Sequence, residues 1–122
     1  MKALIIVSHG SRIENANHEM VELAGEIGKL AESDFHTVRH AFLEFVEPSL
    51  EQQIENLMEL GINRVVLFPL FLAAGKHVAV DLPRILEEAK QRYPEVGFEL
   101  TVHLGDVDGL KEIILNEVMT IH

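Results

Sequence analysis

The sequence predicts an α/β fold, a four-stranded parallel sheet flanked by helices in the order βαβαβαβα. Two short apolar runs, at residues 2–7 and 64–70, are typical of strands that are buried on both faces. Stretches with helical spacing of apolar residues separate the strands, and this alternation favours a parallel sheet with right-handed crossovers. Of the 122 residues, 48% are hydrophobic. We therefore expect a single domain over residues 1–122 whose core needs no disulfide or structural metal.

The first half of the chain contains two strand–helix pairs. From Asn15 to about Ala31 apolar residues recur at helical spacing, with Asn15 as the expected N-cap. Residues 36–43 alternate apolar side chains with His and Arg, which predicts a less buried strand. Pro48 is expected to open the next helix and Gly61 to close it. The side chains expected to face inward from these helices are Ala16, Met20, Leu23, Ala24, Ile27, Leu30, Leu50, Ile54, Leu57 and Met58.

The second half repeats the pattern after the strand at 64–70. A helix is expected from about Asp81 to Tyr93, with Asp81 as its N-cap and Pro94 as its stop. Residues 98–104 alternate apolar and polar, so one face of this strand should meet water, as in an edge strand. A last helix is expected over residues 108–120. The inward-facing side chains expected from these two helices are Leu82, Ile85, Leu86, Ala89, Leu110, Ile113, Ile114 and Val118.

The burial expected for each strand predicts the order of the sheet. The first and third strands are apolar except for the basic residue that begins each, and they belong at the centre, which gives the order 2-1-3-4. Strand order then reverses between strands 1 and 3, and ligands bind at the carboxyl edge of such a point. His9 follows the first strand and His77 follows the third. We therefore expect both imidazoles at this edge, in a shared metal or proton-transfer site.

Charge limits the classes of partner. The formal net charge is −10, from 20 acidic and 10 basic residues, and no basic patch is present. Nucleic acid is therefore not expected as a partner, since binding it requires neutralisation of phosphates. A negative field favours metal cations and opposes anionic substrates at long range. An anionic substrate would have to be held locally, by groups such as Arg12, Arg39, Lys76 or Arg84.

Cysteine content and hydropathy bear on location. The chain has no cysteine, which excludes thiolate zinc sites and cysteine nucleophiles and fits a reducing compartment. No signal-peptide pattern is visible, and the longest apolar stretches are shorter than the roughly 18–20 residues that span a bilayer. We expect a cytoplasmic protein that has no membrane partner.

His9 and His77 are the candidate metal ligands. Two neutral imidazoles suit cobalt, nickel, iron or zinc. A site with so few ligands fits a metal that must be released better than one that is stored. Gly10 allows the first turn to approach a ligand closely. Two other interpretations of this turn stay open, namely a histidine that only hydrogen-bonds within its own loop and an anion cradle formed by the Gly10 and Ser11 amides.

Two carboxylates, Glu44 and Glu47, follow the second strand and so lie beside the first strand in the expected order. One of them could complete a transient metal site or take part in proton transfer. For Glu44 an exposed strand-end carboxylate is the favoured interpretation. For Glu47 a charge at the helix N-terminus competes, and both roles can hold. The histidines expected to have no catalytic role are His18, His36, His40, His103 and His122.

Three motifs carry a family resemblance. They are residues 8–12 (SHGSR), residues 42–48 (FLEFVEP), and residues 68–77 (FPLFLAAGKH) followed by DLP at 81–83. In order and spacing, along essentially the whole chain, this combination resembles the short CbiX-type sirohydrochlorin chelatases of class II. The resemblance implies ATP-independent insertion of a divalent metal into sirohydrochlorin, a cyclic tetrapyrrole. Cobalt is the expected metal, with nickel or iron as alternatives.

The resemblance also implies roles for single residues. His9 would be a metal ligand and the proton acceptor, and His77 the second metal ligand. The metal is a substrate, so no tightly bound cofactor is expected. Arg12, Lys76 and main-chain amides near Gly75 are expected to offset repulsion between this acidic protein and the carboxylates of sirohydrochlorin. The residues that would contact the tetrapyrrole are Glu47, Leu72, Ala73, Ala74, Gly75, Lys76 and His77.

The resemblance further implies a homodimer, because short members pair so that each subunit stands for one half of a two-domain chelatase.

Two other functions compete with the chelatase interpretation. A metal carrier or binding module would retain its metal without turnover, although the sparse ligand set argues against it. A histidine-phosphatase-like enzyme is suggested by His9 and Gly10 with Arg12, yet Ser8 stands where such sites carry an arginine.

Overall fold

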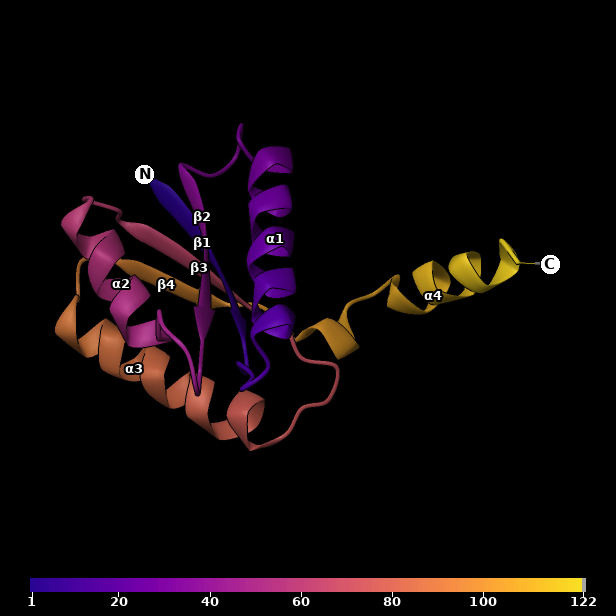
Figure 1. The fold of residues 1–122 in the computed structure, drawn as a ribbon. Coiled ribbons are helices and arrows are strands. Elements are labelled where there is room, and N and C mark those ends of the chain that lie inside the picture. The colour runs from indigo at the N-terminus through magenta and orange to yellow at the C-terminus, as the bar shows by residue number, and fades with distance from the viewer. Residues whose placement is uncertain (122) are drawn as a thin grey trace.

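A computed structural model, which describes residues 1–121, has the parallel sheet and the strand order that the sequence predicts (Figure 1). The strands lie in the order β2-β1-β3-β4 and all pair in parallel. The direction of the strand order therefore changes between β1 and β3. The strands are β1 (Lys2–Ser8), β2 (Thr37–Phe42), β3 (Arg64–Pro69) and β4 (Gly97–Leu100).

Helices cover both faces of the sheet, but unequally. On one face α1 (Glu14–Leu30) lies along β2, and on the other face lie α2 (Leu50–Glu59) and α3 (Leu82–Arg92) (Figure 1). The hydrophobic core lies between the sheet and the α2/α3 layer. The core includes Ala3, Ile5, Val7, Leu50, Ile54, Leu57, Val65, Leu67, Leu82, Ile85, Leu86, Ala89 and Phe98.

Among the described residues, no helix is long and apolar enough to cross a membrane.

The start of α1 differs from the expected one. Ile13, not Asn15, is the N-cap, and its side chain makes no capping bond. Instead the buried Asn17 holds the preceding turn, accepting from the Ser11 amide at 2.9 Å and donating to the Ser11 carbonyl at 2.7 Å. The inward positions of α1 are also partly wrong, because only a narrow strip of this helix meets the sheet. Leu23 is 36% exposed and Leu30, in the last turn, 87%.

The second helix begins two residues later than expected. Pro48 lies before the helix, and Ser49 is the N-cap. The Ser49 hydroxyl accepts from the Gln52 amide at 3.1 Å, while the Gln52 side chain accepts from the Ser49 amide at 2.7 Å. This reciprocal capping box satisfies two amides that the first turn leaves free, which fixes the start of α2.

The expected strand at 98–104 is wrong beyond Leu100. The alternation predicts Val102 inside and His103 in water, yet Val102 is 55% exposed and His103 is buried. The reason is a new contact, because the amide of Gly105 donates to the carbonyl of Phe71 at 3.1 Å. The chain therefore leaves the sheet and packs against the segment that follows β3.

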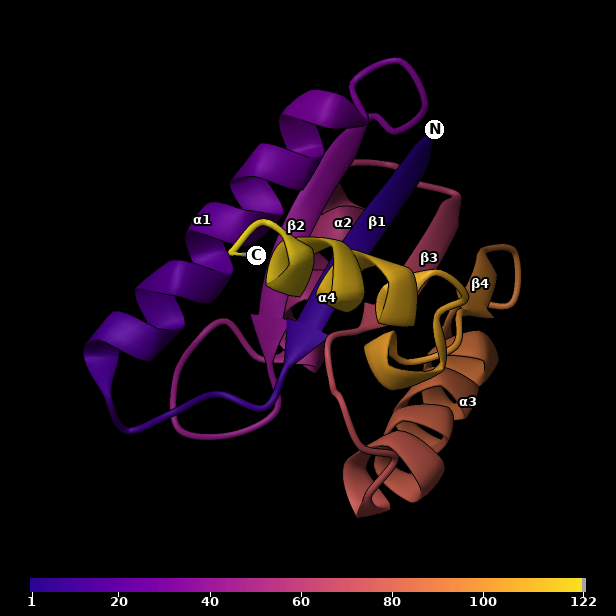
Figure 2. The same cartoon turned by 90° about the vertical axis from the view of Figure 1, so that its right-hand side faces the viewer.

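The C-terminal helix, α4 (Leu110–Met119), is the largest departure from expectation. It forms close to the expected residues but extends away from the sheet, so none of its side chains is buried (Figures 1 and 2). The predicted inward positions Ile113, Ile114 and Val118 are 66%, 55% and 48% exposed. Periodicity reveals an apolar face on a helix but not the surface that covers it.

Candidate metal centre

The first half of the site joins the ends of β1 and β2. The ladder between these strands continues past Phe42, because the Leu43 amide donates to the Ser8 carbonyl and the Glu44 amide to the His9 carbonyl. This pairing brings the two side chains together, with His9 Nε2 3.1 Å from a Glu44 carboxylate oxygen. Both side chains stay open to solvent, at 44% and 46% exposure. Glu44 is thus exposed as expected, but it is also a partner of His9.

The second half of the site comes from the segment after β3. The ring centroid of His77 lies 4.7 Å from that of His9, so the structure brings the two predicted histidines together. One ligand atom each from His9, Glu44 and His77 lies within 4.8 Å of the others. Among residues 1–121, no other group of three or more His, Asp or Glu side chains brings its ligand atoms close enough together to hold one ion. It lies at the carboxyl edge of the sheet, where the strand order reverses.

Asp81 is the N-cap residue of α3, as the sequence predicts, and its side chain holds His77. Its carboxylate lies 2.9 Å from Nδ1 of His77, and it has helical backbone angles with no capping bond. A wide turn from His77 to Asp81 leads directly into α3, so the helical path begins at His77 and spaces the two side chains at i and i+4. With Nδ1 engaged, Nε2 of His77 is the nitrogen free for a metal. A carboxylate behind a ligating imidazole is the usual way to fix its orientation.

Close backbone approaches lock the loops of the site. Gly10 has φ +93°, and a Cβ there would collide with the carbonyl oxygen of Glu44. A Cβ on Gly105 would likewise collide with the carbonyl of Leu72. Phe71 stacks on His77 with ring centroids 6.5 Å apart. The turn that bears His9 and the segment that leads to His77 are therefore each held by a neighbouring strand end.

The remaining predicted site residues surround this cluster without joining it. Glu47 accepts from the Gln52 side chain at 3.2 Å, which places it at the N-terminus of α2, and it lies outside the His9–Glu44–His77 group. Residues 72–76 are exposed along the segment that leads to His77. A cavity of about 160 Å³ opens beside His77. Its lining is Leu43, Glu44, Glu51, His77, Asp81, Arg84 and Ile85.

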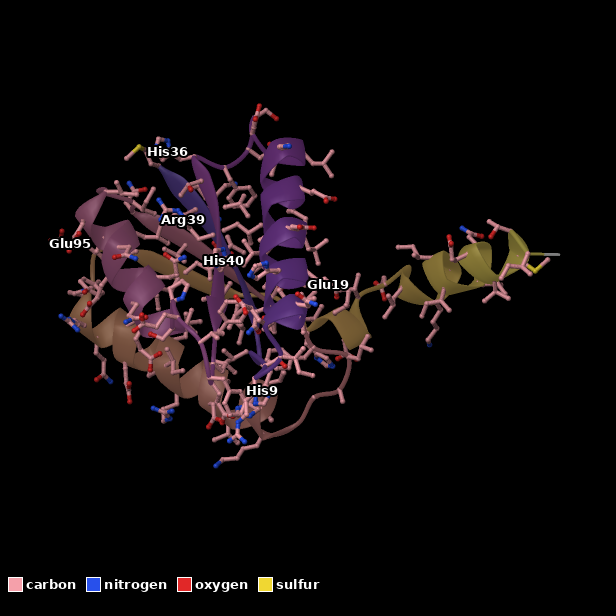
Figure 3. The ribbon with its side chains drawn as sticks, viewed as in Figure 1. His9, Glu19, His36, Arg39, His40 and Glu95 are labelled. Carbon is pink, nitrogen blue, oxygen red and sulfur yellow. The ribbon has the colours of Figure 1, made fainter. Side chains whose placement is uncertain are left out.

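The other described histidines lie away from the cluster. His36 precedes β2 at the end of the sheet opposite His9, and His40 lies midway along β2 (Figure 3). Burial lowers the pKa of His40 below its ordinary value, and the positive charge of Arg39 lowers it further. His18 lies 3.8 Å from Glu14 on the surface of α1. The last histidine of the chain, His122, lies outside the described residues.

Sequence reasoning named Glu44 as one of two carboxylates that could join the site, but it missed the contact of Asp81 with His77. The pairing of Glu44 with His9 had a signal, since Glu44 stands two residues beyond β2, whose neighbour is β1. The role of Asp81 had the i, i+4 spacing from His77, which places two helical side chains on one face. The assembled group offers two imidazoles and a carboxylate, an incomplete set for a tetrahedral or octahedral ion that leaves positions open for water or a second ligand.

The chain is similar in sequence to known proteins. The sequence model of the CbiX family matches residues 3–120. The sirohydrochlorin cobaltochelatase of Methanococcus maripaludis is 36% identical over 86 residues, which cover 70% of this chain but only 58% of that protein. The sirohydrochlorin cobaltochelatase of Saccharolobus solfataricus is 33% identical over 118 residues, covering 93% of this chain and 88% of that protein. The chain thus matches less than two thirds of the length of the first of these relatives.

Solved structures share the fold. A CbiX protein of cobalamin biosynthesis from Marinobacter aquaeolei superposes with a TM-score of 0.78 at 24% identity, covering 98% of this chain and 96% of that one. The sirohydrochlorin chelatase SirB from Bacillus subtilis, in complex with cobalt, gives a TM-score of 0.76 at 24% identity. This chain covers 50% of SirB. The fold therefore corresponds to one half of the longer protein.

Proposed function

The chain belongs to the CbiX family, and we propose that it is a sirohydrochlorin chelatase, an enzyme that inserts a divalent metal into this cyclic tetrapyrrole. The observation that carries the proposal is the group formed by His9, Glu44 and His77, whose ligand atoms lie within 4.8 Å of one another. Relatives at 33–36% identity are sirohydrochlorin cobaltochelatases. We therefore take cobalt as the first candidate metal.

The reaction requires both metal binding and proton removal. A hydrated divalent cation loses its waters and the macrocycle loses two pyrrole N–H protons, so the products are the metallated ring and two protons. Near neutral pH an imidazole can bind the metal and can also accept a proton. We assign metal binding to His9 and His77, and proton acceptance to His9. The contact with Glu44 supports this, because the carboxylate stabilises the imidazolium that forms.

The tetrapyrrole is proposed to lie over the carboxyl edge of the sheet. The exposed residues 72–76 border His77, and Lys76 and Arg12 supply positive charge near an otherwise acidic surface. Glu47 is proposed as a further substrate contact, although its bond to Gln52 gives it a role at the α2 N-terminus as well. The resemblance in the sequence implies these contacts, and the exposure of residues 72–76 supports the proposal.

Nickel and iron are alternative metal substrates. Selectivity among these ions follows geometry and availability more than raw affinity, and a two-histidine, one-carboxylate set accepts all three. SirB has been crystallised with cobalt and with Fe³⁺. A single chelatase-like domain over residues 1–122 and a cytoplasmic location remain predictions from the sequence.

A homodimer is proposed because α4 and part of the sheet both lack a covering layer. The α4 side chains Ile113, Leu115 and Met119 are 66%, 58% and 57% exposed. On the α1 face of the sheet, Val66 and Phe68 of β3 are only half-buried, and α1 packs along β2 instead. Parallel sheets are normally covered on both faces. A second copy whose α4 packs over β3 would complete that layer, and sedimentation velocity would then give twice the 13.7 kDa chain mass.

The test is anaerobic metal insertion followed by visible absorption. Purified protein is mixed with sirohydrochlorin and Co²⁺, Ni²⁺ or Fe²⁺, beside a blank without protein. We expect catalysed insertion that is lost in His9→Ala and in His77→Ala. His36→Ala, at the opposite end of the sheet (Figure 3), is the matched control and should keep full activity. Rates equal to the blank with every metal, together with stoichiometric retention of cobalt, would instead establish a metal carrier.

A further inference from the structure

Phe45 has a backbone conformation that a bulky residue rarely adopts. Its φ is +71°, and among residues 1–121 it is the one non-glycine residue in the left-handed region. Its side chain is 51% exposed, although it is apolar. Strained backbone of this kind collects at binding and catalytic sites, where the surrounding structure holds it in place. The exposure of the ring at such a point therefore calls for a functional explanation.

The neighbouring loops hold the Phe45 ring beside the metal centre. The amide of Val46 donates to the carbonyl of Glu44 at 2.9 Å, which closes a tight turn around Phe45. The same Glu44 carbonyl packs against Gly10, so this turn is fixed against the turn that bears His9. The His9 ring meets the Phe45 ring edge-on, with centroids 5.8 Å apart and an interplanar angle of 84°.

Arg12 is the second component of this arrangement. Its guanidinium carbon lies 4.8 Å from the centroid of the Phe45 ring, a cation–π contact. Within residues 1–121 it makes no ion pair with a carboxylate, in contrast to Arg64, Arg84 and Arg92. A cavity of about 530 Å³ opens beside the pair. Its lining is Ser11, Arg12, Glu14, Asn17, Phe45 and Val46.

We propose that Phe45 and Arg12 form a substrate clamp, in which the Phe45 ring packs on the macrocycle and Arg12 binds one of its peripheral carboxylates. This inference rests on the proposed function. The metal must pass from His9 and His77 to the centre of the ring, so the macrocycle has to come within contact distance of His9. Phe45 is the exposed aromatic surface in contact with that histidine, because the other nearby ring, Phe71, is half-buried behind His77.

The charges near the site favour Arg12 as the carboxylate partner. The cavity beside His77 is lined by the carboxylates Glu44, Glu51 and Asp81 and by one cation, Arg84, which is paired with Glu88. An anionic substrate would therefore be repelled on that side. The guanidinium carries a planar set of donors that matches a carboxylate in two parallel hydrogen bonds. Its contact with Phe45 limits its freedom before binding, so less conformational entropy is lost when the carboxylate arrives.

The experiment for Phe45 is a titration with metal-free sirohydrochlorin, followed by the absorption of the tetrapyrrole. Phe45→Asn removes the ring but tolerates the left-handed backbone, and Phe45→Tyr keeps the ring as the matched control. We expect the Kd to rise about 10-fold for the Asn variant and to stay within 2-fold for the Tyr variant. Co²⁺ binding, titrated without tetrapyrrole, should be unchanged in both. An Asn variant that binds sirohydrochlorin like the wild type overturns the proposal.

The experiment for Arg12 uses Arg12→Gln and two tetrapyrroles with different numbers of carboxylates. Affinity for metal-free sirohydrochlorin should fall about 10-fold, while affinity for a porphyrin with only two carboxylates should change less than 3-fold. Equal losses for both ligands, or no loss for either, would contradict carboxylate recognition by Arg12. Because these titrations contain no metal, they stay informative even if the wild-type protein fails to catalyse insertion, the result that would refute the proposed function itself.

Discussion

The two histidines of the metal centre are held in different ways. His9 lies on a turn, is 44% exposed, and contacts a carboxylate, Glu44, that can itself reach a metal. His77 begins a helix, is 34% exposed, and contacts Asp81, which binds the opposite nitrogen. The carboxylate of Glu44 is thus part of the candidate metal site. The carboxylate of Asp81 instead lies behind the imidazole that it holds.

This difference separates two tasks in the proposed reaction. A carboxylate that contacts both the imidazole and the metal position can share a proton with the imidazole and can also bind the metal. This arrangement suits His9 for proton transfer. A carboxylate behind the imidazole fixes the orientation of the ring, which suits His77 for holding the ion. Substitutions at the two carboxylates should therefore affect different steps.

The largest effect is expected from Glu44→Gln. The amide cannot stabilise the protonated His9, so kcat for metal insertion should fall about 100-fold or more, within the range for loss of acid–base assistance. Steady-state insertion of cobalt into sirohydrochlorin gives this value. Glu95→Gln, an exposed carboxylate far from His9 (Figure 3), is the control and should match the wild type. A Glu44→Gln enzyme with normal kcat but weaker metal binding would make Glu44 a ligand only.

A backbone substitution tests whether the His9 side depends on loop packing. Gly10→Ala places a Cβ against the Glu44 carbonyl at a positive φ, so the free energy of unfolding should fall by about 2–4 kcal/mol. Urea denaturation measures it. Gly25→Ala is the matched control, because that Cβ meets nothing within 4 Å and alanine favours the helix by about 0.5–1 kcal/mol. Equal stability of the two variants would show that the turns are not in contact in solution.

A smaller effect, on binding alone, is expected from Asp81→Asn. Loss of the carboxylate behind His77 should weaken Co²⁺ affinity about 10- to 100-fold, while kcat at saturating metal stays close to normal. Visible titration with Co²⁺ alone gives the affinity. If kcat falls and metal affinity does not, the division of tasks between the two histidines is wrong.

The smallest effect concerns His40, which lies outside the site. Its pKa is lowered in the folded protein by burial and by Arg39, so the unfolded chain binds its proton more readily. The free energy of unfolding is therefore unaffected by His40 above the unfolded pKa of about 6.5, where the imidazole is neutral in both states. It decreases as the pH falls below that value. His40→Gln should therefore flatten the decline of Tm between neutral and mildly acidic pH. His36→Gln should leave that decline unchanged, and the same flattening there would refute the assignment to His40.

The sequence predicts most of the fold but only part of the candidate metal site. The apolar runs at 2–7 and 64–70 suffice for the strand order, and strand order suffices to bring His9 to His77. The contact of Glu44 with His9 depends on backbone pairing that continues past the last residue of β2, and no propensity favours the left-handed turn at Phe45 that follows it. The position of α4 was equally out of reach, because a periodic pattern identifies an apolar face without naming the surface against which it packs.

The parallel topology has a practical consequence for spectroscopy. Every turn that follows a strand lies at the edge with the metal centre, so the turns that precede strands lie at the opposite edge, including residues 31–36 before β2 (Figure 3). Ser33 is exposed in that turn, and the chain contains no cysteine. A single Ser33→Cys substitution therefore provides one unique thiol for a fluorophore, through which metal and tetrapyrrole binding can be followed without a label near the reacting atoms.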